Sequence, residues 1–257
     1  MAIHSTAIVD PRAELDTSVE VGPFVVIGPQ VRIDAGTTIG AHAVIEGRTR
    51  IGKRNRIFQL AAVGATPQDL KYAGEPTELE IGDDNQIREF STLHIGTAGG
   101  GGVTRIGNGN LIMANAHVAH DCQVGNQVVL ANCVALAGHV EVGDHAILGG
   151  LSAVHQFTRV GQYAFLAGGA MVTMDVAPYC MVHGDRAELT GLNTVGLGRN
   201  GFSTDAIEHI KSAYKLLFRS GLLMHEALAK VKAEFATVPE VVLLTDFIQA
   251  SDRGVTR

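Results

Sequence analysis

The chain has 257 residues, of which 46% are hydrophobic and 18% charged, with a formal net charge of −6. This composition excludes a disordered chain, and the acidic balance argues against a nucleic-acid binder, which usually carries a basic face. Its apolar runs fall far short of the roughly 18 residues that a membrane span requires, no secretory signal is recognisable, and three cysteines fit a reducing compartment, so we expect a cytoplasmic protein without stable membrane insertion.

An aliphatic residue recurs at every sixth position over most of the first 172 residues. The series runs from Ile3 to Val63, returns from Ile81 to Leu93, and resumes from Ile106 to Val172. Because side chains alternate along a strand, each aliphatic residue and the mostly small residue two positions earlier face the same way. Three hexads then make one triangular coil that stacks on the coil before it. The period excludes helices and predicts a mainly β solenoid.

Two segments interrupt the hexads. Asp69 and Glu75 fall in phase but are charged, so residues 64–80 are predicted to leave the wall as a loop. A second, Gly-rich excursion is expected over residues 97–103. Long loops on a regular scaffold commonly carry function.

The hexads end before Ser203, and apolar residues then recur at helical spacing. Ser203 is a plausible N-cap for a first helix, which Gly221 would end. Further helices are expected over residues 223–235 and, starting at Pro239, over 239–250. We therefore expect a β-solenoid domain over residues 1–192 and a helical C-terminal domain over 193–257.

Six of the eleven histidines lie within 62 residues, and none takes the aliphatic phase: His94, His117, His120, His139, His145 and His155. They are therefore expected on turns or outer faces. Residues eighteen apart stack on successive coils, about 4.8 Å apart. His120, Gly138, His139 and Gln156 should therefore share one neighbourhood, with Asp121 beside them.

Three roles are open for this cluster. A neutral imidazole could act as a general base towards a sugar hydroxyl, with a backbone N–H of Gly138 stabilising an oxyanion. Three histidines could instead hold a catalytic zinc ion, as in a carbonic anhydrase. The solenoid could also be a scaffold without chemistry.

Several motifs are specific enough to indicate a family: QDLKYAGEPT at residues 68–77, NAHVAHDC at 115–122, LAGH at 136–139 and AVHQF at 153–157. With them the chain resembles the UDP-N-acetylglucosamine O-acyltransferases, hexapeptide-repeat enzymes of the first step of lipid A biosynthesis. The resemblance implies a left-handed parallel β-helix and a homotrimer with sites in clefts between subunits. It implies no cofactor and no metal.

The resemblance also implies roles for individual residues. His120 matches the general base that deprotonates the sugar 3-hydroxyl, which attacks the thioester of a (R)-3-hydroxyacyl-acyl carrier protein. Gly138 matches the oxyanion-binding position, and Asp121 is placed to orient the imidazole. Substrate contacts are implied for Gln68, Asp69, Lys71, His94, His117, His139, His155, Gln156, Asn193 and Arg199.

The chain departs from the family pattern at Ile95 and Asn200, where basic residues are usual. A 3-amino sugar acceptor, the acyl chain length and a different hexapeptide-repeat acyltransferase activity stay open. Acyl carrier proteins are acidic, so a basic patch should receive one. Lys211, Lys215 and Arg219 recur at i, i+4 and i+8, and we expect them to face the carrier.

Overall fold

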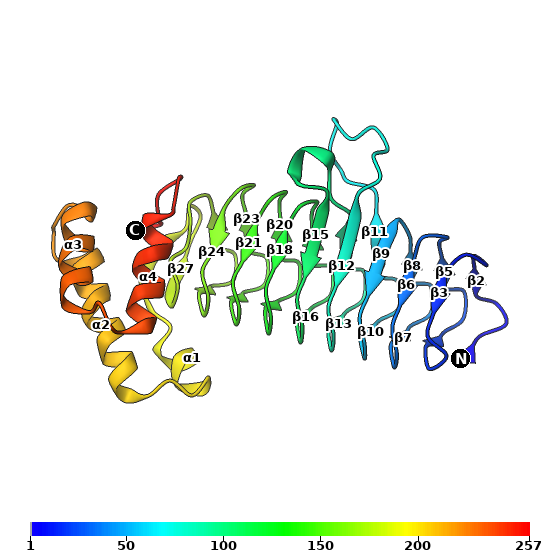
Figure 1. The fold of residues 1–257 in the computed structure, drawn as a ribbon, viewed down its shortest axis with the longest axis horizontal. Coiled ribbons are helices and arrows are strands. Elements are labelled where there is room, and N and C mark those ends of the chain that lie inside the picture. The colour runs from blue at the N-terminus through cyan, green and yellow to red at the C-terminus, as the bar shows by residue number, and fades with distance from the viewer. Residues whose placement is uncertain (1) are drawn as a thin grey trace.

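A computed structural model describes residues 2–257. The chain forms a long solenoid with a group of helices at its C-terminal end (Figure 1). Its strands form three walls, and the fold is a left-handed parallel β-helix with C-terminal helices, which confirms the predicted fold class. Within residues 2–257, no helix is long and apolar enough to cross a membrane.

The three walls are called wall 1, wall 2 and wall 3 in chain order. Among the described residues, wall 1 contains β1 (Ala2–Ile3), β4 (Glu20–Val21), β7 (Thr38–Ile39), β10 (Arg56–Ile57), β13 (Gln86–Ile87), β16 (Leu111–Ile112), β19 (Val129–Leu130), β22 (Ile147–Leu148), β25 (Phe165–Leu166), β27 (Cys180–His183) and β28 (Glu188–Leu192). Wall 2 contains β2 (Ile8–Val9), β5 (Val26–Ile27), β8 (Val44–Ile45), β11 (Ala62–Ala65), β14 (Thr92–His94), β17 (His117–Val118), β20 (Ala135–Leu136), β23 (Ala153–Val154) and β26 (Met171–Val172). Wall 3 contains β3 (Glu14–Leu15), β6 (Arg32–Ile33), β9 (Arg48–Ile51), β12 (Glu78–Ile81), β15 (Val103–Ile106), β18 (Gln123–Val124), β21 (Glu141–Val142) and β24 (Arg159–Val160).

The aliphatic series forms the core of the solenoid. Ile27, Ile87 and Leu136 are at most 1% exposed, and burying each such side chain stabilises the fold by roughly 1.5–3 kcal/mol. Ile3 is 40% exposed because it lies in the first coil, which has a neighbouring coil on one side only.

Corners join the walls along three edges, each of which we name by its side chains. The apolar edge joins wall 1 to wall 2, the histidine edge joins wall 2 to wall 3, and the aromatic edge joins wall 3 to wall 1. Most corners contain one residue with φ near +60°, including Asp121 and His139 on the histidine edge. This left-handed conformation is unusual for residues with a Cβ and repeats here because every coil turns its corners alike.

Both predicted excursions leave the solenoid on the same side (Figure 1). Strand β11 ends at Ala65 and β12 begins at Glu78, so the first loop is slightly shorter than expected. The second excursion joins β14 to β15 and contains a short 3₁₀ helix, η1 (Ala98–Gly100). Both are inserted at the histidine edge.

The C-terminal helices are α1 (Thr194–Arg199), α2 (Thr204–Arg219), α3 (Met224–Glu234) and α4 (Pro239–Gln249). The Ser203 side chain caps α2 by accepting from the Ala206 N–H, as predicted, and Gly221 has φ +76° beyond its end. The sequence did not predict α1 or the antiparallel pairing of β27 with β28, which fall between the last hexad and the first amphipathic pattern.

Candidate active site

The predicted stacking on the histidine edge is present. His120 and Asp121 follow β17, and Gly138 and His139 occupy the same positions one coil later, after β20. The His139 N–H donates to the His120 carbonyl at 3.1 Å, which fixes this register. Gln156 follows one further coil along, after β23. Three separate segments therefore contribute to one edge.

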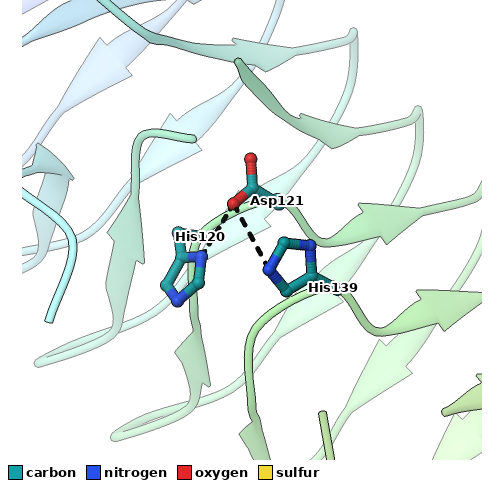
Figure 2. Close-up of side chains that lie close together, drawn as sticks. All are labelled: His120, Asp121 and His139. Carbon is teal, nitrogen blue, oxygen red and sulfur yellow. Dashed lines mark hydrogen bonds and ion pairs between the residues drawn. The ribbon is translucent and has the colours of Figure 1, made fainter. Parts of the chain in front are cut away.

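His120 and Asp121 form a hydrogen-bonded pair (Figure 2). His120 Nδ1 lies 2.7 Å from Asp121 Oδ2, and the Asp121 side chain is fully buried while that of His120 is 14% exposed. A carboxylate only accepts, so Nδ1 carries the proton in this bond. The other ring nitrogen, Nε2, is left with a free lone pair.

Gly138 lies against the face of this imidazole. A Cβ at position 138 would be 2.6 Å from His120 Cε1 and 2.7 Å from Nε2, so only glycine leaves room for the ring. Within residues 2–257 the Gly138 N–H donates to no other group, as is also true of the N–H of His120 and Gln156 at the equivalent corner positions. The residue that packs against the His120 ring therefore has a free backbone N–H.

His139 packs against the pair from the next coil. Its ring meets that of His120 edge-on at 5.2 Å and stacks on Phe157 at 4.3 Å. His139 Nε2 is 3.8 Å from Asp121 Oδ2, too far for a hydrogen bond (Figure 2). Burial lowers the pKa of His139, and the Asp121 and Asp69 carboxylates partly oppose that effect.

His94 is buried, contrary to the expectation that every histidine of the group lies on a turn or an outer face. It is 3% exposed at the end of β14, and its ring contacts that of His117 edge-on at 4.9 Å. The His117 Nδ1 lies 2.7 Å from the Thr92 hydroxyl. Burial lowers the pKa of His94 to about 4, with smaller contributions from His117 and His120, and burial also lowers the pKa of His117. Both rings are therefore neutral at pH 7.

The low pKa of His94 predicts a loss of stability in mild acid. Free histidine titrates near 6.5, so between about pH 6.5 and pH 4 the unfolded chain binds a proton that the folded chain does not. Stability contributed by neutral His94 is therefore present above pH 6.5 and is lost as the pH falls towards 4. On going from about pH 7 to pH 5, the Tm of the wild type should fall further than that of His94→Gln.

The control for this comparison is His225→Gln, because His225 is exposed on α3. On the same change of pH, the Tm of His225→Gln should fall by as much as the Tm of the wild type. Equal pH slopes for His94→Gln and the wild type would contradict the assignment.

The first loop brings Gln68, Asp69 and Lys71 to the same side of the molecule. The Lys71 N–H donates to Asp69 Oδ1 at 3.0 Å, and the Asp69 carboxylate is close enough to influence the pKa of His139. Leu70 at the loop tip is fully exposed. These contacts place the loop over the histidine edge.

His155 and Gln156 lie on the histidine edge two coils beyond His120, and both are exposed. The C-terminal segment returns to this point, where the Arg253 guanidinium donates to the Gln156 carbonyl. No motif in the sequence pointed to Arg253.

Other candidates lie on a different edge of the chain. His145 stacks on Tyr163 at 4.7 Å on the aromatic edge, so its inclusion in the histidine cluster was wrong. Asn193 also lies there: its amide donates to the Tyr163 carbonyl, and its side-chain oxygen caps α1. Arg199 is exposed at the end of α1. A single chain therefore does not bring Asn193 and Arg199 to His120.

The zinc alternative finds little support in these distances. Among residues 2–257, the one group with the spacing of metal ligands is His120, Asp121 and His139, which contains two histidines instead of three. Asp121 Oδ2 already accepts from the Thr97 hydroxyl and pairs with His120 Nδ1. The Asp121 oxygen and His120 Nδ1 are thus already engaged in hydrogen bonds.

A groove of about 990 Å³ lies along wall 3 beside α4. The groove is lined by the ion pairs Glu80–Arg105 and Glu141–Arg159 and by the ring of Phe247. None of the clustered histidines lines it, so we assign the chemistry to the histidine edge.

Comparison with known proteins agrees with this geometry. A family model described as "Udp N-acetylglucosamine O-acyltransferase; Domain 2" matches residues 175–256, and one described as "Bacterial transferase hexapeptide (six repeats)" matches residues 104–138. An acyl-[acyl-carrier-protein]--UDP-N-acetylglucosamine O-acyltransferase of Myxococcus xanthus is 63% identical over 99% of both chains. The solved UDP-N-acetylglucosamine O-acyltransferase of Moraxella catarrhalis is 48% identical over 100% of both chains, with a TM-score of 0.97. The enzyme of Arabidopsis is 36% identical over 99% of this chain and 100% of its own, with a TM-score of 0.87.

Proposed function

The chain belongs to the UDP-N-acetylglucosamine O-acyltransferase family and is an acyltransferase, and on that premise we propose that it acylates the 3-hydroxyl of UDP-N-acetylglucosamine. The donor is a (R)-3-hydroxyacyl-acyl carrier protein, and the product is the ester that begins lipid A biosynthesis in the cytoplasm. The hydrogen-bonded pair of His120 and Asp121 beside a free Gly138 N–H is the observation that carries this proposal.

Nε2 of His120 accepts the proton of the sugar 3-hydroxyl as its oxygen attacks the thioester carbonyl. The carbonyl electron pair moves onto oxygen, where the Gly138 N–H stabilises the negative charge. As the tetrahedral intermediate collapses, the C–S bond breaks and the proton passes from His120 to the leaving thiolate. Asp121 holds the Nδ1–H and stabilises the imidazolium that forms in between.

The remaining groups on the histidine edge bind the sugar nucleotide. Asp69 and Lys71 of the first loop supply a carboxylate and an ammonium opposite the histidines, and Gln68 lies beside them. His94 and His117 are neutral at pH 7, so they accept or donate hydrogen bonds without a competing positive charge. Further polar side chains follow on successive coils of the histidine edge: His139, His155 and Gln156.

The three walls differ in the chemistry of their outward residues, which supports a homotrimer. In the two-residue strands from β4 to β26 the second residue is buried and the first faces outward. Wall 3 presents Glu14, Arg32, Arg50, Glu80, Arg105, Gln123, Glu141 and Arg159. Wall 2 presents Ile8, Val26, Val44, Ala62, Thr92, His117, Ala135, Ala153 and Met171. The apolar edge exposes large side chains at Phe24, Leu60, Phe90 and Leu151, which are 43–67% exposed.

Apolar surface of this extent indicates a partner, and three copies form an allowed closed ring. We place the apolar edge on the threefold axis, wall 1 of one subunit against wall 2 of the next, and wall 3 in solvent. The outer end of each interface then joins the histidine edge of one subunit to the aromatic edge of its neighbour. Asn193 and Arg199 lie on that second edge, where they can complete the site.

The carrier protein would approach this outer cleft past α2. Lys211 is ion-paired with Glu208 at 2.7 Å, and Lys215 is exposed. Arg219 is engaged with its own chain, because it donates to the Leu189 carbonyl and the Tyr214 hydroxyl. Lys211 and Lys215 are therefore the members of the basic row that we propose as carrier contacts.

An acyl-transfer assay tests the proposed function. The purified protein is offered the 3-hydroxy and 3-amino forms of the sugar nucleotide, each with (R)-3-hydroxyacyl carriers of several chain lengths. We expect acylation of the 3-hydroxy form, with an alkali-labile ester product identified by mass spectrometry. A strong preference for the amine would redirect the proposal to amide formation, and no product with any carrier would reject it.

A further inference from the structure

The Gly-rich excursion between β14 and β15 folds back onto the buried carboxylate of the catalytic pair. The Thr97 N–H donates to Asp121 Oδ1 at 2.9 Å, and the Thr97 hydroxyl donates to Asp121 Oδ2 at 2.6 Å. Thr97 is 7% exposed and Asp121 is 4% exposed, so both bonds are shielded from water. One residue thus holds both oxygens of the carboxylate.

Glycines let the excursion approach this closely. A Cβ at Gly100 would lie 2.1 Å from Asp121 Cγ, and one at Gly96 would lie 2.9 Å from Oδ1. The turn is closed by the Thr97 carbonyl, which accepts from the N–H groups of Gly100 and Gly102 at 3.1 and 2.9 Å. The backbone therefore packs directly on the carboxylate and leaves it no room to rotate.

The same carboxylate oxygen faces the proposed base. Oδ2 accepts from the Thr97 hydroxyl on one side and from His120 Nδ1 at 2.7 Å on the other. The Asp121 N–H, in turn, donates to the Thr104 hydroxyl at 2.7 Å, which anchors the backbone of this corner. The orientation of the His120 ring consequently depends on Thr97 of the excursion and on Thr104 of β15.

We propose that Thr97 is a positioning residue for acyl transfer: its hydroxyl fixes Asp121 Oδ2 so that His120 keeps its proton on Nδ1 and presents Nε2 to the sugar hydroxyl. This proposal rests on the proposed role of His120 as general base. Thr97 keeps its own proton throughout, and it touches neither substrate. Its effect is therefore confined to the orientation and tautomer of the imidazole.

Thr97→Val tests the proposal, because it removes the hydroxyl and nearly preserves the volume. We expect kcat to fall about tenfold, which is the lower end of the loss expected when a group that orients a functional side chain is removed. KM for the sugar nucleotide should change less than about twofold. Thr97→Ser restores the hydroxyl and should recover most of the wild-type kcat. Should Thr97→Val fail to fold, Thr97→Ala provides the same comparison.

Thr245→Val is the matched control. Its hydroxyl is also buried and donates to a backbone carbonyl, that of Val242, but it lies in α4. This variant is expected to change Tm without changing kcat. An equal loss of kcat in Thr245→Val and Thr97→Val would mean a general effect on stability and would overturn the proposal.

The ¹⁵N chemical shifts of labelled histidine rings give a second readout that a purely structural role would not move. The His120 signals, identified by their absence in His120→Asn, should report the Nδ1–H tautomer in the wild type and a mixture of tautomers in Thr97→Val. Unchanged tautomer and kcat in Thr97→Val, with His120→Ala inactive, would reject the role of Thr97 alone. Full activity of His120→Ala would instead reject the proposed base.

Discussion

Replacement of His120 by alanine should lower kcat for acyl transfer by about 100- to 10,000-fold, the range that a positioned general base contributes. The sugar hydroxyl would then have to lose its proton to water, while the carbonyl would still be held near the Gly138 N–H. The side chain lies on an edge of the solenoid and outside its aliphatic core, so the fold should persist. Steady-state assays with saturating carrier and sugar nucleotide measure the effect.

The neighbouring histidines explain why one imidazole should dominate. His94 and His117 have lowered pKa values because they are buried, so they are neutral and do not oppose the positive charge that His120 gains in the transition state. His139 touches the pair but lies 3.8 Å from the carboxylate, beyond hydrogen-bonding distance. Among residues 2–257, none of these three histidines forms a hydrogen bond to a carboxylate like the one that fixes the tautomer of His120.

His225→Ala is the matched control, since this histidine is exposed on α3 and far from the edge. It should retain wild-type kcat. If His120→Ala kept activity within about tenfold of the wild type, general-base catalysis by this residue would be excluded.

The period of six was sufficient to predict the solenoid, its stacking and its interruptions. Because the core uses one aliphatic residue per strand, the rule that residues eighteen apart stack placed Gly138 over His120 without any structure. The same rule places His145 one wall beyond His139, on the next edge, so its assignment to the cluster could have been avoided from the spacing alone.

Other features depend on contacts that periodicity does not encode. Thr97, which bonds to Asp121, lies in the irregular segment between β14 and β15. The buried His94 is the last residue before that segment. The left-handed coil was predicted only from the family resemblance, since a repeat of six residues is compatible with either hand. The location of Asn193 and Arg199 follows from α1, a short helix with no amphipathic pattern.

The separation of these two residues from His120 leads to the second large expected effect. If a site needs the histidine edge of one subunit and the aromatic edge of the next, then two inactive variants should restore activity together. His120→Ala removes the base, and Arg199→Glu reverses a charge that we propose to contact the nucleotide. Arg199 is exposed and makes no ion pair among residues 2–257, so its replacement should not disturb the fold.

Each variant alone should lose nearly all activity. When both are co-expressed with different tags and mixed trimers are isolated, about one site in three combines an intact His120 with an intact Arg199 from its neighbour, because every mixed trimer contains one such interface. The isolated mixed trimers should therefore show about a third of the wild-type activity per subunit.

The control pairs His120→Ala with the double variant His120→Ala/Arg199→Glu, in which no arrangement completes a site, and it should stay inactive. Activity of the first mixture equal to the sum of its separately assayed components would show that each chain carries its own complete site. That result would remove the reason for joining the histidine edge to the aromatic edge, because Arg199 would then have to act without reaching a neighbouring His120. Recovery near one third is difficult to explain in any other way, since neither subunit contains both groups on one edge.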